Sequence, residues 1–131
     1  MTEPDPIRFA RHGVILNTMH YDRCVAFYRD VLALPIMFAK GEKGDGLTCF
    51  ALGDAYLMVE HGGVAVTAGK SVDLGAIKLR FNVHDVGAAA QRLQEAGVDV
   101  ELFQYDWGTT AEFYDPDGNR CALRSEHDFL L

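Results

Sequence analysis

The sequence predicts an α+β fold in which two βαβββ modules form curved mixed sheets around a shared cleft, with the helices on the convex side. Three observations support this fold class. Two amphipathic segments, His20–Leu34 and Asp85–Val98, can be laid over each other. A short apolar strand precedes each of them, at Gly13–Met19 and Lys78–Val83, and a further strand and an apparent hairpin follow each. A repeat of about 65 residues that fills the chain indicates one supersecondary unit used twice.

The first half begins with a strand in which Val14 and Leu16 alternate with residues of the opposite face. The next segment has apolar side chains at helical spacing, which predicts one buried stripe: Cys24, Val25, Tyr28, Val31 and Leu32. Pro35 should end this helix because its ring nitrogen has no proton to donate. Glycines and charges at 41–46 indicate a loop, and Gly53–Asp54 is a turn dipeptide. The strands expected in this half are Arg11–Met19, Ile36–Ala39, Leu47–Leu52 and Ala55–Glu60.

The second half repeats this plan. Asp85 can cap its helix, and Gly97 can end it. The segment 115–118 (DPDG) predicts a tight turn, because proline fixes the second position and glycine takes a left-handed conformation. Trp107 is expected in the loop before the last hairpin. The strands expected in this half are Lys78–Val83, Val98–Phe103, Thr110–Tyr114 and Arg120–Arg124.

Length and composition restrict the organisation and the class of the protein. We expect one domain over residues 1–131, with a first module at 11–61, a connecting loop at 62–75 and a second module at 76–126. The net charge of −7 argues against nucleic-acid binding, which requires a basic surface. The apolar runs are far shorter than the roughly 20 residues that span a bilayer, and the N-terminus resembles no signal peptide. Three scattered cysteines favour buried thiols, so we expect a cytoplasmic protein without membrane or nucleic-acid partners.

Two motifs carry a resemblance to a known family. FYRDVL at residues 27–32 lies in the first helix, and DPDGN at residues 115–119 precedes the last strand. At this separation, and on this repeat, they resemble the vicinal-oxygen-chelate superfamily, which includes glyoxalase I, bleomycin-resistance proteins and extradiol dioxygenases. The likeness covers residues 11–126, nearly the whole chain. It implies the two-module fold but leaves the chemistry open, because one fold carries many functions.

Members of this superfamily with metal chemistry place one ligand on the first strand and one on the last strand of each half, usually His or Glu. Matching the motifs puts these four positions on Gly13, Met58, Lys78 and Ala122. None of these side chains is a normal ligand of a divalent ion, and a lysine would first have to lose its proton. We therefore expect no metal and no other cofactor. The alternative is a bulged strand that turns His12 inward beside Glu60, which would supply at most two ligands.

Strand alternation predicts which side chains line the concave face. The expected ligand-binding residues are Tyr56, Met58, Glu60, Lys78, Arg80, Arg120 and Arg124, with Trp107 from the neighbouring loop. This mixture of apolar and cationic groups suits a ligand that carries a carboxylate, a phosphonate or an enolate. Alternatively, the basic side chains reach the rim and pair with Glu60, Glu112 or Glu126. Trp107 either stacks on a planar ligand or packs against a dimer partner.

Lys78 is the candidate catalytic residue, because its ammonium would stand where relatives hold a metal cation. It could stabilise a developing oxyanion or act as a base or an amine nucleophile. Paired with Glu60, it would instead be inert.

These features lead to one expected function and one rival. The first is a homodimeric, metal-independent protein that binds a small organic ligand between its modules and could sequester it. This function is similar to antibiotic resistance in the bleomycin-resistance branch. The rival is an enzyme of the lyase, isomerase or dioxygenase type, acting on a small oxygenated anion through Lys78 or an unrecognised metal site.

Overall fold

Two four-stranded mixed sheets with the same internal order make up the protein. The computed structural model describes residues 3–41 and 45–130, so residues 42–44 of the loop expected at 41–46 lie outside the described residues. The first sheet contains β1 (Gly13–Thr18), β2 (Ile36–Lys40), β3 (Leu47–Leu52) and β4 (Ala55–His61). The second contains β5 (Leu79–Val83), β6 (Glu101–Tyr105), β7 (Gly108–Tyr114) and β8 (Arg120–Ser125). Their orders, β1-β4-β3-β2 and β5-β8-β7-β6, confirm the predicted internal repeat.

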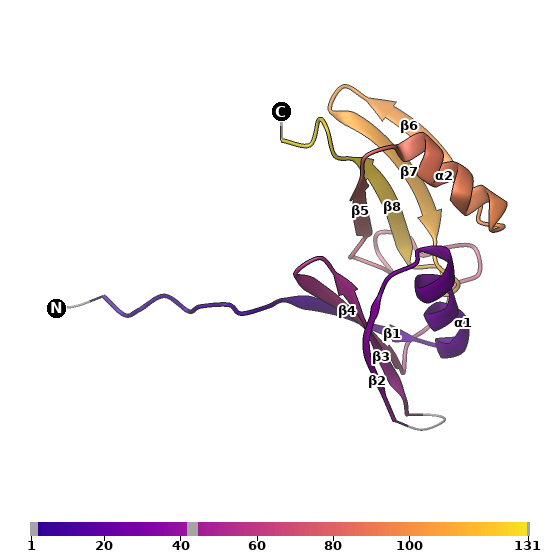
Figure 1. Ribbon diagram of the computed structural model, residues 1–131. Helices are drawn as coiled ribbons and strands as arrows, with labels where there is room; N and C mark the ends of the chain where they lie inside the picture. The colour runs from indigo at the N-terminus through magenta and orange to yellow at the C-terminus, as the bar shows by residue number, and fades with distance from the viewer. Residues whose placement is uncertain (1–2, 42–44, 131) are drawn as a thin grey trace.

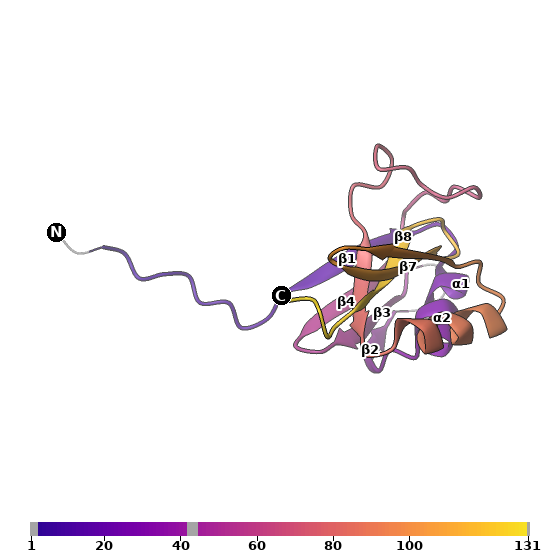
Figure 2. The ribbon, with the colours of Figure 1, turned by 90° about the horizontal axis from the view of Figure 1, so that it is seen from above.

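Each half places its first and last strands side by side. The pairs β1–β4 and β5–β8 are parallel, and the remaining pairs are antiparallel. The helices α1 (Tyr21–Ala26) and α2 (Val86–Glu95) lie on the same side of the two sheets (Figure 1). Residues 3–12 extend away from the body, and the connection from β4 to β5 loops out at the top of Figure 2. Within the described ranges, neither helix is long and apolar enough to cross a membrane.

The first helix is shorter than predicted and changes type along its length. After α1 the chain continues as a π-helical turn, η1 (Phe27–Val31), in which the Leu32 N–H bonds the Phe27 carbonyl at 3.1 Å. Ala33 then adopts a left-handed φ of 56°. The helix has therefore ended before Pro35, which sequence reasoning took as its terminator. By contrast, Asp85 caps α2 as predicted, accepting from the backbone N–H of Ala88 at 3.0 Å.

The strand expected at Val98–Phe103 is displaced toward the C-terminus. Its first residues, Val98 and Val100, belong to the connection after α2, where they pack against the core and so imitate the apolar pattern of a strand. β6 and β7 are joined by a two-residue turn, since Tyr105 pairs directly with Gly108. Trp107 therefore lies in the turn between β6 and β7, whereas the sequence analysis expected it in a loop before the last hairpin. The other strands begin and end within two residues of their predicted limits.

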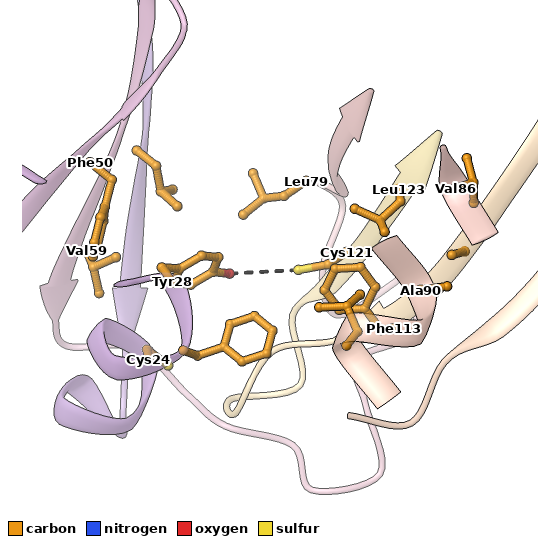
Figure 3. Packing of buried hydrophobic residues seen from close by; sticks show 14 residues of the cluster. Cys24, Tyr28, Phe50, Val59, Leu79, Val86, Ala90, Phe113, Cys121 and Leu123 are labelled. Carbon is orange, nitrogen blue, oxygen red and sulfur yellow. Dashed lines mark hydrogen bonds between the residues drawn. The ribbon is translucent and has the colours of Figure 1, made fainter. Parts of the chain in front are cut away.

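One hydrophobic core joins the two halves. Its buried members come from both sheets and both helical segments: Cys24, Phe27, Tyr28, Phe50, Leu57, Val59, Leu79, Val86, Ala90, Leu93, Ala111, Phe113, Cys121 and Leu123. Figure 3 shows Tyr28 of the first half reaching toward Cys121 of the second, 3.8 Å away. The Tyr28 hydroxyl also donates to Asp115 Oδ2 at 2.7 Å. Burial, together with Cys121 and Asp115, raises the pKa of Tyr28 and keeps it a donor.

The DPDGN turn fastens the second half to the first. Gly118 takes a φ of 81°, as the turn requires. The fully buried Asp117 carboxylate accepts from the backbone N–H groups of Met19 and His20 at 2.6 and 3.1 Å, and from His20 Nδ1 at 2.9 Å. Burial opposes ionisation of Asp117, but these hydrogen bonds outweigh it and hold its pKa below the usual value. The turn thus caps α1, whose own N-cap residue, His20, makes no side-chain cap.

Candidate ligand-binding face

The side of the two sheets turned away from the helices is called the open face below. In β4, Leu57 and Val59 are fully buried toward the helices, while Tyr56, Met58 and Glu60 are only half-buried. This alternation confirms the predicted facing of the strand. The open face therefore contains the side chains singled out from the sequence.

On the first sheet, the ring of Tyr56 covers Gly13. The two residues are direct neighbours in the parallel β1–β4 pair. A Cβ atom at residue 13 would lie 2.4 Å from two ring carbons of Tyr56, far inside van der Waals contact. Glycine is therefore required for the present packing, at the position aligned with the first metal ligand of the superfamily.

The chemistry of the four aligned positions does not fit a divalent ion. Glycine and alanine offer no ligand atom, the methionine thioether is too soft, and the lysine carries a competing charge. The β1–β4 register is unbroken from Gly13, and the Tyr56 N–H bonds the His12 carbonyl at 3.1 Å, so the bulge that would turn His12 inward is not formed. Within residues 3–41 and 45–130, no three His, Cys, Asp or Glu side chains form a group that could hold a metal.

Lys78 lies on the open face just before β5 and forms an ion pair. Its Nζ is 3.2 Å from Oε1 of Glu112 on β7, so the pair reaches across the intervening strand β8. The acid is Glu112 and not Glu60, the partner considered for an inert lysine. The two side chains are 35% and 30% exposed, so both remain accessible to a ligand.

Arg120 and Arg80 have different partners, although both belong to the open face. Arg120 donates from Nε and Nη2 to the carbonyl of Gly75, at 3.2 and 3.0 Å, and so holds the connecting segment. Arg80 is exposed, and its guanidinium lies 5.9 Å from the ring centre of Phe129 in the C-terminal segment. Arg80 is thus the more available cation.

Arg124 is almost completely buried and tightly held. Only 4% of it is exposed. Its Nη1 donates to Asp128 Oδ1 at 2.6 Å and to the Ser125 carbonyl at 2.6 Å, and its Nη2 donates to the Trp107 carbonyl at 2.7 Å. The hydrogen bond from Ser125, with the nearby Arg124, lowers the pKa of Asp128 and keeps it ionised. Arg124 therefore organises the end of the sheet around Trp107.

Three aromatic side chains form a stacked row along β6 and its turn. The rings of Phe103 and Tyr105 are 6.1 Å apart at 19°, and those of Tyr105 and Trp107 are 4.6 Å apart at 8°. The Trp107 ring also lies 5.0 Å from the Arg124 guanidinium, which places the row on the open face. Sequence reasoning found only Trp107. The aromatic residues at every second position, 103, 105 and 107, are the signal that could have revealed the row.

The structure separates the predicted site residues into two groups. Tyr56, Met58 and Glu60 share β4, whereas Lys78, Arg80, Arg120, Arg124 and Trp107 belong to the second sheet. In the described part of the chain, no hydrogen bond or ion pair joins the two groups. One hollow of about 280 Å³ is lined by both halves, but its walls are helix-side residues such as Leu32, Leu34, Ala89 and Leu93. The second sheet therefore provides the denser set of functional groups.

Comparison with known proteins agrees with this architecture. The model of the Glyoxalase/Bleomycin resistance protein/Dioxygenase superfamily matches residues 10–123. The crystal structure of SMU.1112c superposes with a TM-score of 0.74 and 25% identity, covering 86% of this chain and 96% of that one. TnmS3, an antibiotic binding protein from Streptomyces sp. CB03234, gives 0.70 and 22%, covering 93% and 98%. Lactoylglutathione lyase from Agrobacterium tumefaciens gives 0.69 and 20%, covering 95% and 96%.

No curated protein matches the chain. The extent of the family match, the repeated strand order and the position of the DPDGN turn nevertheless agree with one another. The chain belongs to the glyoxalase/bleomycin resistance protein/dioxygenase superfamily.

Proposed function

We propose that this protein binds a small, planar, oxygen-bearing organic molecule on the open face of its second sheet, and that it does so without a metal ion. The observation that carries this proposal is the stacked row of Phe103, Tyr105 and Trp107. These rings are 36%, 46% and 48% exposed, so a large apolar surface faces outward. A contiguous exposed aromatic surface is typical of a binding site, and flat rings favour a flat ligand.

The charges beside the row favour an anionic or carbonyl-bearing ligand. Lys78 and Arg80 lie on the same face as the row, although the chain as a whole carries a net charge of −7. Glu112 already balances the charge of Lys78, so Arg80 is the cation that would attract a carboxylate, a phenolate or an enolate.

The same residues support sequestration of the ligand as the first candidate role. The side chains at the aligned ligand positions offer no site for the superfamily's metal, and the ring of Tyr56 fills the space above Gly13. TnmS3, which has the same fold, is described as an antibiotic binding protein, and this supports an antibiotic-like ligand. Here the cytoplasmic protein would hold such a molecule away from its target.

We also propose a homodimer in which a second copy covers the open face of the first sheet. Ile15 on β1 and Phe38 on β2 lie at the two edges of that face and are 49% and 38% exposed. Apolar surface of this extent is normally covered by a partner. Sedimentation equilibrium should give twice the mass of the chain, and Ile15→Glu should shift it to the monomer.

The test uses Trp107, the single tryptophan of the chain, as the reporter. We expect an anthraquinone carboxylate to quench its fluorescence saturably, with the same dissociation constant before and after treatment with EDTA. Tyr105→Ala should weaken binding by about threefold to tenfold, because one ring contact is lost. Phe9→Ala, which removes an exposed ring from the N-terminal arm, is the matched control and should change nothing. Absence of saturable quenching, or loss of binding on chelation, would refute the proposal.

The Lys78–Glu112 ion pair favours a second candidate function. An ammonium and a carboxylate 3.2 Å apart on an accessible face can pass a proton to and from an enolisable substrate. Phenylpyruvate in deuterated water would then exchange its α-protons faster with the protein than without it. Lys78→Ala should abolish that acceleration while EDTA leaves it intact. If Lys78→Ala retains the exchange, the lysine has no such role.

A further inference from the structure

We infer that the C-terminal segment acts as a built-in competitor on the open face. Phe129 occupies the place of the ligand's ring, and a ligand that displaces it presents an acceptor oxygen to Arg124 Nε and the Thr110 hydroxyl. The inference rests on the proposed function, because it identifies what that site would recognise.

The first observation is that two aromatic rings from different segments lie close to the Arg124 guanidinium. The Arg124 guanidinium lies 5.0 Å from the ring centre of Trp107 and 5.2 Å from that of Phe129. Trp107 belongs to the aromatic row, whereas Phe129 comes from the segment after the last strand, which lies on the side of β8 opposite α2 (Figure 1). Phe129 thus already makes the contact that a planar ligand would make with this cation.

The second observation is a pair of buried donors without partners. Thr110 and Arg124 are direct neighbours across the β7–β8 pair, so their side chains lie on the same face. They are only 1% and 4% exposed. Thr110 Oγ1 and Arg124 Nε are buried, yet neither has a hydrogen-bond partner. Nη1 and Nη2 of Arg124 each have a partner, so Nε is the guanidinium nitrogen without one.

Buried donors rarely remain unsatisfied, because each loses its hydrogen bonds to water. Two such groups at paired positions, next to exposed aromatic rings, fit a single acceptor oxygen supplied from outside. A quinone carbonyl, a phenolate or a ring carboxylate attached to a planar system matches both the donors and the rings. The ligand class is therefore a planar aromatic with an oxygen acceptor at its edge.

The third observation is that hydrogen bonds anchor the C-terminal segment without using the Phe129 ring, since the Phe129 N–H donates to the Glu126 carbonyl at 3.0 Å. Asp128 accepts from Arg124 Nη1 and from the Ser125 hydroxyl, both at 2.6 Å. The Phe129 ring itself is 43% exposed, and besides Arg124 it approaches the guanidinium of Arg80. The contact with the exposed Arg80 is weak, and a ligand ring placed on Arg124 would replace the other contact, so the Phe129 ring can swing away while Asp128 stays bound.

The test compares three variants with the wild-type chain, using the anthraquinone carboxylate as the probe and Trp107 fluorescence as the readout. Phe129→Ala should tighten binding about fivefold or more, since the competing ring contacts are removed. Leu130→Ala, at the neighbouring exposed residue, is the matched control and should leave the affinity unchanged. Thr110→Val keeps the side-chain shape, so it should weaken binding about tenfold without lowering the melting temperature.

A direct readout follows the displaced ring. para-Fluorophenylalanine at position 129 should move to its solvent-exposed fluorine chemical shift when the probe saturates the protein. The inference fails if Phe129→Ala binds no more tightly than wild type, or if the fluorine signal stays in place at saturation. It also fails if Thr110→Val binds like wild type, because a buried water would then satisfy the two donors.

These outcomes are distinguishable from failure of the proposed function. If Tyr105→Ala weakens binding but Phe129→Ala and Thr110→Val bind like wild type, only the competitor and its acceptor site are wrong. If neither the wild type nor Phe129→Ala binds the probe, both proposals are wrong.

Discussion

Asp117→Ala should show how strongly the second half of the chain supports the first. The Asp117 carboxylate is fully buried and accepts three hydrogen bonds, two of them from backbone N–H groups at the start of α1. The alanine variant leaves those groups without an acceptor. Each unsatisfied buried donor costs about 1–3 kcal/mol, and a lost helix cap costs about 0.5–2 kcal/mol. These overlapping terms give a loss of about 3 kcal/mol in the free energy of unfolding.

A loss of this size is a large part of the stability of an ordinary domain, which is about 5–15 kcal/mol. Urea unfolding, followed by circular dichroism and by Trp107 fluorescence, measures the loss in the free energy of unfolding. Thermal unfolding should show a fall in melting temperature of about 10 °C. Asp54→Ala, at an exposed turn position in the first sheet, is the control and should cost little. A loss below about 1 kcal/mol for Asp117→Ala would refute the reasoning, because the N–H groups would then be satisfied by water.

Three further predictions concern pH, packing and charge. Because hydrogen bonds lower the folded pKa of Asp117, its ionised form stabilises the fold above the unfolded pKa of about 4, and this contribution disappears as the pH falls through the folded pKa. Wild type should therefore lose more stability on acidification than Asp117→Asn, and parallel acid titrations of the two would contradict this. Gly13→Ala should cost about 1–3 kcal/mol in urea unfolding, and Tyr56→Ala in the same chain should recover most of that loss. Lys78→Ala should change the free energy of unfolding by less than about 1 kcal/mol, because its ion pair with Glu112 is partly exposed; a larger loss would indicate that the pair is structural.

Sequence patterning predicted the fold because each element was marked locally. Alternation in β4 identified its buried face, and Asp85 and Gly118 occupy the cap and turn positions that their chemistry predicts. The strand expected at Val98–Phe103 was misplaced for a physical reason. Val98 and Val100 pack on the core from an irregular connection, and burial alone does not distinguish a buried connection from a strand.

The site was less accessible to sequence reasoning, since it depends on distant pairings. Sequence reasoning offered Glu60 as the partner of an inert Lys78 and left Glu60, Glu112 and Glu126 open for the basic side chains; the strand order brings Lys78 to Glu112. Arg124 was expected to face a ligand, and the structure shows most of its donors already used within the chain. The sequence analysis did not consider Phe129, because no local motif indicates that the C-terminal segment returns to Arg124 of β8.

The open face has a different set of side chains in each half of the fold. In the first sheet an aromatic ring has taken the space of a ligand side chain, and glycine at the neighbouring position is its consequence. In the second sheet a lysine stands at an aligned ligand position, and its charge is balanced by the acid on β7. Each replacement depends on a partner residue, Tyr56 or Glu112, so restoring His or Glu at the four aligned positions alone would create a steric clash and an unbalanced acid. The difference from the superfamily's His and Glu ligand set therefore extends beyond the four aligned positions to the residues packed against them.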